Sequence, residues 1–548
     1  MAFDLAVRPI RPGRVLHFDG RLLVVDKPPG IPVHGGDESL GGDLVSRLSE
    51  FLRAEGTDGY VGVHQRLDLG TSGVTVFTAA REANAEIARA AERHGLERRY
   101  VAAVTFRSKE LAARLERGDV ALEHRLLHER GRTRVVTRGG DVAVASLRLL
   151  ERHGERALVE LRPETGRTHQ LRVQLASVGA PVAGDELYGG DRAARLLLHA
   201  RELTLPDGRT FRADIPHAFA WVRGESSFGD AAVLEAALAD AAILRAPLAS
   251  QSDCYRLVNG EGDGLPGVTA DRYGDFAVLN VFEDEARERA GELARGLIAL
   301  GARGVYVKLR VRADLRRLPA EELAPKTPLA GEAAPERYLV HENGMAIHVE
   351  LADGLSSGLF LDQRDNRRRV TGLAGGARVL NLFSYTGSFG VAAALGGARR
   401  VVNVDLSGRA LARARDNFEA NGIDPNLHAF EQTDAVEFLK RAKRGSFELV
   451  ILDPPSFSSQ AEGGAFRIDK ELGVLAERAL VALAPGGSLL AVTNHKKTSQ
   501  SRLRALVKEA AARAGVALRQ LKDMRSPLDC PPGPDGPTPS RSVLATRG

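Results

Sequence analysis

The sequence predicts a multidomain protein of the α/β and α+β classes. A mixed-sheet N-terminal domain precedes a small α+β unit and a Rossmann-like doubly wound C-terminal domain. A chain of 548 residues is too long for one ordinary hydrophobic core, so two or three domains are expected. After residue 378, buried strands alternate with helices, which is the pattern of a parallel sheet. The expected units are residues 1–225, a linker helix at 226–250, a small accessory unit at 251–351 and a C-terminal domain at 352–548.

Composition narrows the cellular context and the partners. No apolar run approaches the roughly 20 residues that span a bilayer, and the first residues do not resemble an export signal. We therefore expect a cytoplasmic protein with no membrane partner. The two cysteines, Cys254 and Cys530, are too few for a disulfide scaffold or a cysteine-rich zinc site, and no metal is expected. A net charge of +5 with a pI of about 9.2 is compatible with an RNA partner but does not require one.

The N-terminal domain shows clear strand and helix signals. Residues 21–26 read as a strand that ends at two prolines, since proline cannot continue a ladder. Residues 44–52 keep helical spacing, and residues 81–94 are helical by composition. Two more strands are expected at 99–104 and 157–161, and the second runs into a turn that opens a helix with Thr168 as its cap.

Residues 64–73, His-Gln-Arg-Leu-Asp-Leu-Gly-Thr-Ser-Gly, form a turn that presents one carboxylate, Asp68. Alone, an Asp in such a turn bonds to its own backbone. Its companions are Lys-Pro-Pro-Gly at 27–30, Tyr100, Thr-Gly-Arg-Thr-His-Gln-Leu-Arg at 165–172 and Gly-Asp-Glu-Leu-Tyr-Gly at 184–189. In this order, over about 190 residues, these motifs resemble the RluA-type pseudouridine synthases.

The resemblance implies that uridine in RNA is isomerised to pseudouridine without a cofactor, with Asp68 as nucleophile or base. Arg167 corresponds to the arginine that pairs with the catalytic Asp and fixes its direction. Tyr100 corresponds to the aromatic residue that packs on the target base, which must be flipped or unpaired. Taken singly, these would be a turn Asp, a surface Arg and a core Tyr; their combination favours the functional interpretation.

The match departs from the family pattern at one place. The family usually has His directly before Arg-Leu-Asp, whereas here Gln65 follows His64. We expect this change to leave the stretch from Arg66 through Leu67 to Asp68 intact. The resemblance covers enzymes of both ribosomal and transfer RNA and does not choose between them.

The second half begins with a small α+β pattern and continues with the doubly wound one. The first part reads as a strand, glycine-rich hairpin and strand at 255–271, a strand at 276–282, a helix at 286–300, a strand at 304–309 and a loop at 318–336. The second part has buried strands at 379–383, 400–404, 448–452 and 485–492. Ligands of such sheets bind at the carboxyl ends of the strands.

The turn after the first of these strands and the end of the second indicate a nucleoside cofactor. Asp405 ends the second strand, 18 residues after Gly387, a placement suited to the hydroxyls of a ribose. A nicotinamide cofactor is the first rival, but the turn lacks Gly-x-Gly-x-x-Gly, so no cradle for a pyrophosphate is evident. A nucleoside without phosphates fits better, and S-adenosyl-L-methionine is the common one.

Residues 253–500 resemble the S-adenosylmethionine-dependent 23S ribosomal RNA methyltransferases of the RlmI and RlmK type. The matching motifs are Tyr-Arg-Leu-Val-Asn-Gly-Glu at 255–261, Phe-Leu-Asp-Gln-Arg-Asp-Asn-Arg at 360–367, Asn-Leu-Phe-Ser-Tyr-Thr-Gly at 381–387 and Asp-Pro-Pro-Ser-Phe at 453–457. The resemblance implies that the cofactor is bound by Phe383, Ser384, Tyr385, Thr386, Gly387, Asp405, Asp434 and Asp453. The methyl-transfer site would be lined by Asp453, Pro454, Pro455 and Phe457, and the candidates for closing the pocket are Asp362 and Arg364.

Which atom is methylated depends on whether a cysteine is available as a nucleophile. Carbon C5 of cytosine is not nucleophilic until a thiolate adds at C6, and the RlmI-type enzymes have that cysteine just after the late strand. Here the strand continues into Val492-Thr493-Asn494-His495, which resembles the RlmK-type guanine-N7 enzymes. Cys254 lies in the accessory unit, and the sequence leaves open whether Cys530 folds back. We therefore favour guanine N7, with guanine N2 and cytosine C5 as alternatives.

The sequence thus predicts a bifunctional RNA-modification enzyme with 23S ribosomal RNA as its expected partner. Its N-terminal domain would form pseudouridine, and its C-terminal domain would methylate a base with S-adenosylmethionine. One alternative has a catalytically inactive domain that serves as an RNA-binding module. Another is a non-enzymatic ribosome-assembly factor.

Overall fold

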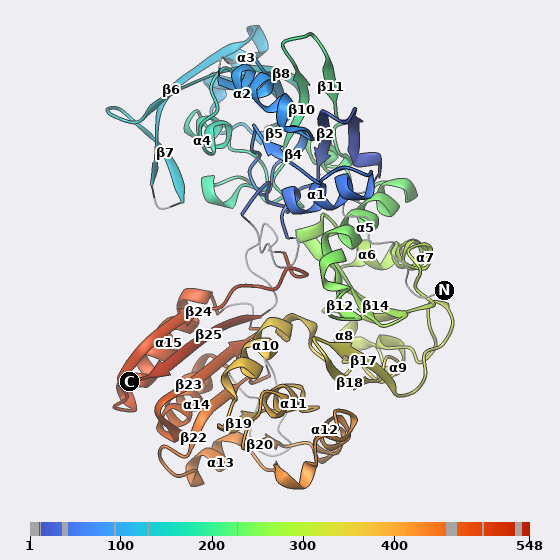
Figure 1. Cartoon of the computed structure of the whole chain (residues 1–548), viewed down its shortest axis with the longest axis vertical. Helices are drawn as coiled ribbons and strands as arrows, with labels where there is room; N and C mark the ends of the chain where they lie inside the picture. The colour runs from blue at the N-terminus through green and yellow to red at the C-terminus, as the bar shows by residue number, and fades with distance from the viewer. Residues whose placement is uncertain are drawn as a thin grey trace.

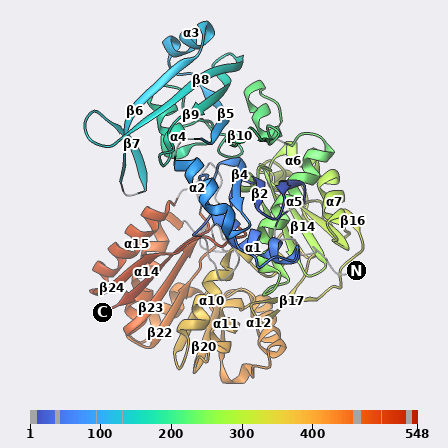
Figure 2. The ribbon, with the colours of Figure 1, turned by 45° about the horizontal axis from the view of Figure 1, so that its top comes forward.

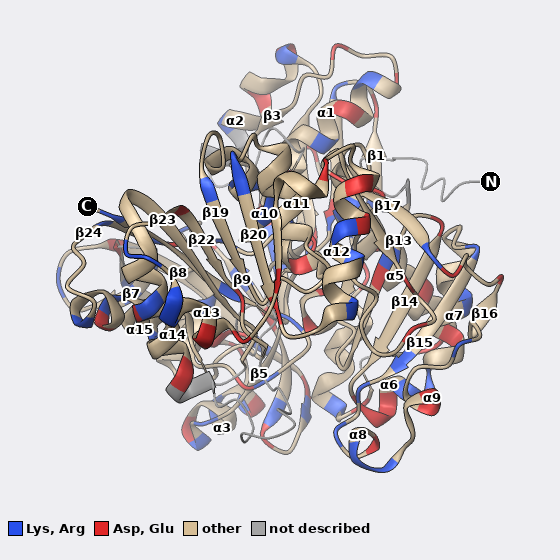
Figure 3. Ribbon diagram, turned by 90° about the horizontal axis from the view of Figure 1, so that it is seen from below, with Lys and Arg blue, Asp and Glu red and all other residues tan. Residues whose placement is uncertain are grey.

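The computed structural model describes residues 10, 12–35, 42–92, 95–129, 131–226, 228–455, 468–495, 498–531 and 540–548. Three large sheets follow one another along the described part of the chain and occupy the blue-to-teal, green and orange-to-red parts of the molecule (Figure 1). Lys and Arg are interspersed with Asp and Glu along the elements seen in Figure 3, in keeping with the small net charge of +5. The mixed α/β and α+β class that the sequence predicts is confirmed.

The N-terminal sheet has eleven strands in the order β1-β2-β4-β10-β5-β9-β8-β6-β7, with β3 beside β4 and β11 beside β10. Its pairs are antiparallel except β4 with β10. The strands are β1 (Val15–Phe18), β2 (Leu22–Lys27), β3 (Gly62–Val63), β4 (Ser72–Thr78), β5 (Glu97–Thr105), β6 (Val120–Glu129), β7 (Arg132–Val136), β8 (Asp141–His153), β9 (Arg156–Pro163), β10 (Leu198–Thr204) and β11 (Thr210–Arg212). The helices are α1 (Leu44–Ala54), α2 (Asn84–Glu92), α3 (Lys109–Arg117) and α4 (Gln170–Ser177), with 3₁₀ turns η1 (Pro12–Arg14), η3 (Arg81–Ala83), η4 (Glu186–Tyr188) and η5 (His217–Arg223).

Strand β10 aligns the segments that carry the N-terminal motifs. Ala200 pairs with Gly73 on one side and with Tyr100 on the other. Gly73 has a φ of +115°, and a Cβ there would lie 2.2 Å from the carbonyl oxygen of Ala200, so only glycine fits. The sheet thereby places the loop before β4 next to Tyr100.

The accessory part contains a five-stranded sheet and a hairpin. The sheet order is β12-β13-β14-β15-β16. The strands are β12 (Cys254–Asn259), β13 (Val268–Tyr273), β14 (Phe276–Val281), β15 (Gly304–Leu309) and β16 (Ala330–Gly331), and the hairpin is β17 (Tyr338–Glu342) with β18 (Met345–Val349). Its helices are α5 (Ala231–Arg245), α6 (Asp284–Glu288), α7 (Ala290–Ala299), α8 (Asp314–Arg317) and α9 (Ala320–Leu323), with 3₁₀ turns η6 (Ala246–Leu248) and η7 (Gly260–Asp263).

The C-terminal sheet has seven strands in the order β21-β20-β19-β22-β23-β25-β24. The first five of these run parallel, and β25 is antiparallel to both of its neighbours. The strands are β19 (Arg378–Leu382), β20 (Arg400–Asp405), β21 (Ala429–Gln432), β22 (Phe447–Leu452), β23 (Leu483–Thr493), β24 (Leu518–Asp523) and β25 (Arg541–Arg547). The helices are α10 (Arg364–Leu373), α11 (Ser388–Leu395), α12 (Gly408–Ala420), α13 (Ala435–Arg441), α14 (Ile468–Ala482) and α15 (Gln500–Arg513), with η8 (Leu361–Gln363) and η9 (Pro425–Leu427).

Some local predictions are wrong. Thr168 does not cap α4: the N-cap is His169, whose backbone is left-handed with a φ of 54° and whose side chain makes no capping bond. The predicted helix at 286–300 is interrupted at Arg289 and forms α6 and α7. The predicted loop at 318–336 contains α9 and β16, because the edge of the accessory sheet pairs with Ala330 and Gly331.

Buried arginines join the three parts at the end of α5, which lies beside α1 in Figures 1 and 2. Arg47 on α1 donates to the carbonyls of Ile243 and Leu244 at 2.6 and 2.9 Å, which satisfies terminal acceptors of α5. The fully buried Arg245 uses all five N–H groups, two of them on Asp263 and one on the carbonyl of Asp529. The C-terminal segment is thereby tied to the accessory sheet.

Arg245→Ala is expected to lower the free energy of unfolding by about 3–5 kcal/mol, because it leaves the buried Asp263 carboxylate without its cation. The matched control is Arg212→Ala, which removes an exposed pair with Glu202 and should cost less than about 1 kcal/mol. Scanning calorimetry measures both. If both substitutions lowered the free energy of unfolding by the same small amount, Arg245 would not be the residue that holds the three parts together.

Candidate active sites

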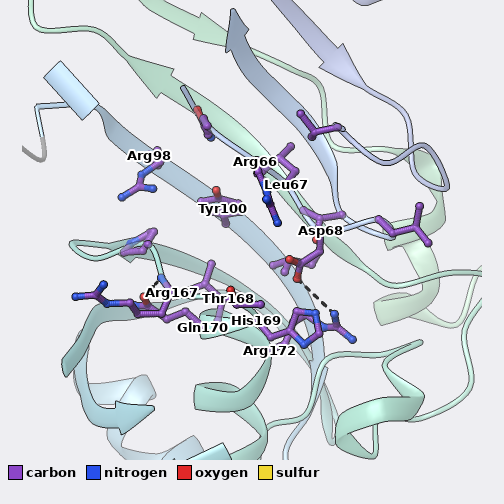
Figure 4. A pocket seen from close by; sticks show the side chains of 18 of the residues that line it. Arg66, Leu67, Asp68, Arg98, Tyr100, Arg167, Thr168, His169, Gln170 and Arg172 are labelled. Atoms are coloured by element: carbon purple, nitrogen blue, oxygen red, sulfur yellow. Dashed lines mark hydrogen bonds and ion pairs between the residues drawn. The ribbon is translucent and has the colours of Figure 1, made fainter. Parts of the chain in front are cut away.

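A cavity of about 1090 Å³ lies where the loop before β4 faces β5 and the start of α4 (Figure 4). The predicted residues Asp68, Tyr100 and Arg167 all line it, together with Arg66, Arg98 and Arg172. Four arginines around the Asp68 carboxylate suit a polyanionic ligand.

None of the helices in the described ranges combines the length and apolar character that crossing a bilayer requires. Within those same ranges, no three or more His, Cys, Asp or Glu residues are arranged to bind a metal ion.

The Asp68 loop is anchored from below by Lys27. The Lys27 ammonium donates to the carbonyls of Pro28, Ile31 and Leu69 at 3.0, 2.8 and 3.2 Å. The N–H of Gly30 donates to the same Leu69 carbonyl at 2.9 Å. Burial lowers the pKa of Lys27 to about 7, with a contribution from Arg195, and the charge of Asp68 opposes this. The residue after Asp68 is thus fixed by two donors.

Arg172, and not Arg167, pairs with Asp68. Arg172 Nη1 lies 3.4 Å from Asp68 Oδ2, and its Nε and Nη2 donate to both oxygens of the buried Asp185 at 2.7 and 2.8 Å. Burial opposes the charge of Arg172, but the bonds to Asp185 and the charges of both carboxylates outweigh it and raise the pKa of Arg172. The prediction that Arg167 forms this pair is wrong, because α4 begins after Arg167 and only Arg172 lies on its first turn.

Arg167 lines the same cavity but points away from Asp68 in Figure 4. Its Nη1 lies 3.6 Å from Asp141 Oδ2, and its side chain is 45% exposed. Its backbone N–H donates to Gln170 Oε1 at 3.0 Å. This placement suits contact with RNA that enters the cavity, while the orientation of Asp68 depends on Arg172.

Tyr100 and Gln65 form the side of the cavity on β5. Burial raises the pKa of Tyr100, and the neighbouring Asp68 adds to this, whereas Arg98 and a hydrogen bond with Gln65 oppose it. His64 instead bonds to Thr78 Oγ1 at 3.0 Å, on the side of β4. The inserted Gln65 therefore lies beside Tyr100, and Arg66, Leu67 and Asp68 still face the cavity.

His169 lines the cavity, and the buried Asp185 binds Arg172 from outside the lining; the sequence predicted neither as a site residue. His169 lies in the cavity wall and its Nδ1 is 3.0 Å from the Tyr188 hydroxyl, which accepts from the N–H of Thr133 at 2.9 Å. Both Asp185 and Tyr188 belong to the Gly-Asp-Glu-Leu-Tyr-Gly motif. The motif's function in the fold is to hold Arg172 and His169 against Asp68.

Arg172→Lys is expected to reduce the initial rate of pseudouridine formation about 100-fold, because lysine cannot replace the two parallel bonds to Asp185 and Asp68 would turn. Arg167→Lys keeps the charge in the cavity wall and should change the rate less than tenfold. Tritium release from 5-tritiated uridine measures both rates. A larger loss for Arg167→Lys than for Arg172→Lys would restore the pairing first predicted.

The second site lies at the carboxyl ends of β19, β20 and β22. The loop after β19 holds two non-glycine residues in the left-handed region, Phe383 at a φ of 57° and Tyr385 at 48°, followed by Gly387 at 76°. Such strain concentrates at binding sites. A Cβ on Gly387 would lie 2.7 Å from that of Ala414, so α12 packs directly on this loop. The hydroxyl of the buried Ser384 has no hydrogen-bond partner in the described part of the chain.

At the carboxyl edge of this sheet, Asp405 and Asp434 each accept hydrogen bonds from nearby backbone N–H groups. Asp405 accepts from the N–H groups of Tyr385 and Ser407 at 2.8 and 2.9 Å, which ties the end of β20 to the strained loop. Asp434 caps α13 by accepting from the N–H groups of Val436 and Glu437. In each case, carboxylate lone pairs remain for a nucleoside hydroxyl or amine.

Asp453 follows directly after β22 and precedes Pro454 and Pro455. Burial raises the pKa of Asp453 to about 7; the charge of Asp362 adds to this and that of Arg367 opposes it. Asp362 is therefore electrostatically coupled to the end of β22. Phe457 lies outside the described residues.

Arg364 does not point into an open pocket. Its side chain is 3% exposed, and Nη1 lies 2.8 Å from Asp529 Oδ2. Phe360, four residues earlier, places its ring 5.6 Å from that of Tyr385. The segment before α10 therefore covers the loop after β19 through Phe360, and Arg364 fixes this segment to the C-terminal one.

Asp405→Ala is expected to weaken the affinity for S-adenosylmethionine about 10- to 100-fold, because a charged hydrogen-bond acceptor and the anchor of Tyr385 are both lost. The control is Asp424→Ala, which removes a comparable turn-forming carboxylate that accepts from the N–H of Asn426 at 2.9 Å. Isothermal titration calorimetry measures both. Unchanged affinity in Asp405→Ala would refute its contact with the ribose.

Comparison with known proteins matches both halves. A family model described as RNA pseudouridylate synthase matches residues 21–177. A model described as S-adenosylmethionine-dependent methyltransferase matches residues 255–537. The two matched segments contain the two sites described above.

Individual relatives agree with the second match. A protein of Aeromonas salmonicida named ribosomal RNA large subunit methyltransferase I is 40% identical over 286 residues, which cover 51% of this chain and 70% of the relative. One of Deinococcus radiodurans, named ribosomal RNA large subunit methyltransferase, is 38% identical and covers 55% and 74%. A solved methyltransferase structure complexed with SAH is 26% identical with a TM-score of 0.52, covering 63% of this chain and 87% of that one.

Proposed function

The chain belongs to the family of S-adenosylmethionine-dependent methyltransferases and carries an RNA pseudouridylate synthase domain before the methyltransferase domain. From this we propose that one polypeptide isomerises uridine and methylates guanine N7 in 23S ribosomal RNA. The synthase reaction needs no cofactor, and S-adenosylmethionine supplies the methyl group. As domains we propose residues 1–225, 226–250, 251–351 and 352–548, with RNA binding by the third.

For the first reaction, the ion pair of Arg172 with Asp68 supports the proposal. The C–N glycosidic bond of uridine breaks, the uracil turns, and a bond from C5 to the same ribose carbon forms, so no atoms are gained or lost. Arg172 holds the Asp68 carboxylate toward the cavity that also contains Tyr100, and the flipped base would stack there.

For the second reaction, the state of the cysteines supports a ring nitrogen. Guanine N7 has its own lone pair and needs only positioning, whereas cytosine C5 requires a thiolate. Strand β23 ends at Thr493, and the next residues are Asn494 and His495. Cys530 folds back to the accessory sheet but is fully buried, and burial, with the charge of Asp529, raises the pKa of its thiol well above the ordinary value.

Cytosine C5 is the second candidate, because two observations favour it. The relative from Aeromonas salmonicida is named as a methyltransferase I, the type that the sequence resemblance connects with a thiolate. Cys530 also feels the charges of Asp362, Arg256 and Arg364, so it lies close to the segment that covers the cofactor edge. A movement of the C-terminal segment would be needed to expose it.

The test uses the full chain with ribosomal RNA from a strain that lacks the gene. Tritium release from 5-tritiated uridine reports pseudouridine formation, and label from S-adenosylmethionine followed by nucleoside mass spectrometry identifies the methylated base. We expect pseudouridine and 7-methylguanosine, with Cys530→Ser as active as the wild type. Formation of 5-methylcytidine that Cys530→Ser abolishes would select the second candidate. No activity in either assay would favour an assembly factor.

A further inference from the structure

A polar pocket of about 320 Å³ opens at the carboxyl edge of the C-terminal sheet. Its lining includes Asp362 and Asn366 from the segment around η8 and α10, Gln500 from α15, and Arg541 and Ser542 from β25. Arg541 pairs with Thr493, the last residue of β23, which places the pocket at the edge where the cofactor site lies. Its volume is at the lower end for small-molecule sites, so it suits one planar ring system.

Opposite charges line this pocket without neutralising each other. Asp362 lines the pocket and has no hydrogen bond or ion pair with another of the described residues, although its charge acts on the buried Arg256 and Arg367. Arg541 donates from Nη1 to the His495 carbonyl at 3.3 Å, but its buried Nε has no partner in the described part of the chain. Buried polar groups normally have partners. The pocket therefore offers a carboxylate acceptor and a guanidinium donor to a ligand with both kinds of group.

The walls between these charges are held by hydrogen bonds. Asn366 Nδ2 donates to Gln363 Oε1 at 2.8 Å and to Ser542 Oγ at 3.1 Å. Gln500 Nε2 donates to the Ser542 carbonyl at 3.0 Å. Three separate elements are thus joined around the pocket, which preorganises its shape.

The pocket adjoins the methyl-transfer edge. Phe360, two residues before Asp362, packs its ring against Tyr385 of the strained loop. The hydroxyl of Thr386 donates to the Gly358 carbonyl at 2.6 Å, so the same segment is fixed to that loop. The charge of Asp362 also reaches Asp453 at the end of β22.

We propose that this pocket, called the base pocket below, receives the guanine to be methylated, with Asp362 accepting from its N1–H and 2-amino group and Arg541 donating to its O6. Among the four RNA bases, only guanine presents two adjacent N–H donors on its Watson–Crick edge, and a carboxylate accepts both. Cytosine and adenine each present one amino group next to an acceptor. Recognition of that edge leaves N7, on the far side of the ring, free to react. The inference rests on the proposed guanine-N7 function.

The experiment compares Asp362→Asn and Arg541→Gln with the wild type, using ribosomal RNA from the gene-deletion strain. We expect kcat/KM for the RNA to fall about 10- to 100-fold in both variants, while the dissociation constant of S-adenosylmethionine stays within twofold. The matched control is Asp416→Asn on α12, which removes an exposed carboxylate paired with Arg337 and should leave methyl transfer unchanged. The unchanged affinity for S-adenosylmethionine shows that the C-terminal domain of each variant is folded, and pseudouridine formation shows the same for the N-terminal domain.

The outcomes separate this inference from the proposed function. Wild-type 7-methylguanosine with undiminished transfer by both variants would overturn the base pocket and leave the function standing. A parallel loss of cofactor affinity would assign the pocket to the cofactor and also overturn the inference. Wild-type production of 5-methylcytidine would overturn the function and, with it, the guanine assignment. Loss of RNA methylation in both variants at unchanged cofactor affinity supports the base pocket.

Discussion

Asp68→Asn is expected to abolish pseudouridine formation, with a loss of at least about 1,000-fold, while methyl transfer continues at the wild-type rate. The substitution keeps the size of the side chain but removes the charge that Arg172 Nη1 holds at 3.4 Å. An amide is neither a nucleophile nor a base at neutral pH. Asp68 is the one carboxylate of residues 64–73, so the substitution removes the group that would act as nucleophile or base. Tritium release and methyl incorporation on one RNA preparation measure the two rates together.

The control for this substitution is Asp141→Asn. Asp141 is 67% exposed and lies 3.6 Å from Arg167 at the cavity rim, so it has a comparable charge close to the same arginine-rich surface. We expect Asp141→Asn to retain pseudouridine formation within a few-fold. Persistent conversion of uridine in Asp68→Asn would remove Asp68 from the mechanism.

The second large effect concerns Asp453 and pH. Burial raises the pKa of Asp453 to about 7, so the carboxyl is mainly neutral at pH 6 and mainly ionised at pH 8. Methylation of guanine N7 places a positive charge on the base, which an adjacent carboxylate stabilises only when ionised. The rate constant kcat/KM for methyl transfer should therefore rise about tenfold between these two pH values, with an inflection near pH 7.

Asp453→Asn should remove this inflection and reduce kcat/KM at pH 8 by about 100-fold or more. Pseudouridine formation in the same preparations provides the control, because Asp453 lies in the other site. A wild-type profile that is flat or falls from pH 6 to pH 8 would show that the ionised form of Asp453 does not assist methyl transfer.

The doubly wound sheet could be predicted because its signals are local. The segments that form β19, β20 and β22 are apolar runs that end in polar or small residues, and the strand expected at 400–404 lies within β20. The same applies to the strained loop after β19, where the motif itself marks the position. What the sequence did not show is β25, whose antiparallel pairing with β23 depends on contacts between distant segments.

Strands β6, β7 and β8 were not predicted for a different reason. In β6, buried residues alternate with exposed ones, and the exposed positions include Glu123, Arg125 and Glu129. The high local charge of this segment hides the apolar alternation on which a strand prediction rests.

The arginine that pairs with Asp68 could not be predicted from its motif alone. Arg167 and Arg172 belong to one motif, and sequence alone does not say which of them faces Asp68. The choice depends on where α4 begins and on Asp185, which lies 13 residues beyond Arg172 and fixes its guanidinium. Helical spacing from Gln170 would have placed Arg172 on the first turn, which is the one local signal that was available.

Nucleoside analysis of ribosomal RNA from a gene-deletion strain and its parent tests whether one chain performs two RNA modifications. Mass spectrometry with cyanoethylation, which tags pseudouridine, counts both products in one digest. We expect the deletion strain to lose one pseudouridine and one 7-methylguanosine, and expression of the wild-type chain to restore both. Loss of 5-methylcytidine instead would exclude the nitrogen target, and identical nucleoside profiles of the two strains would exclude both activities.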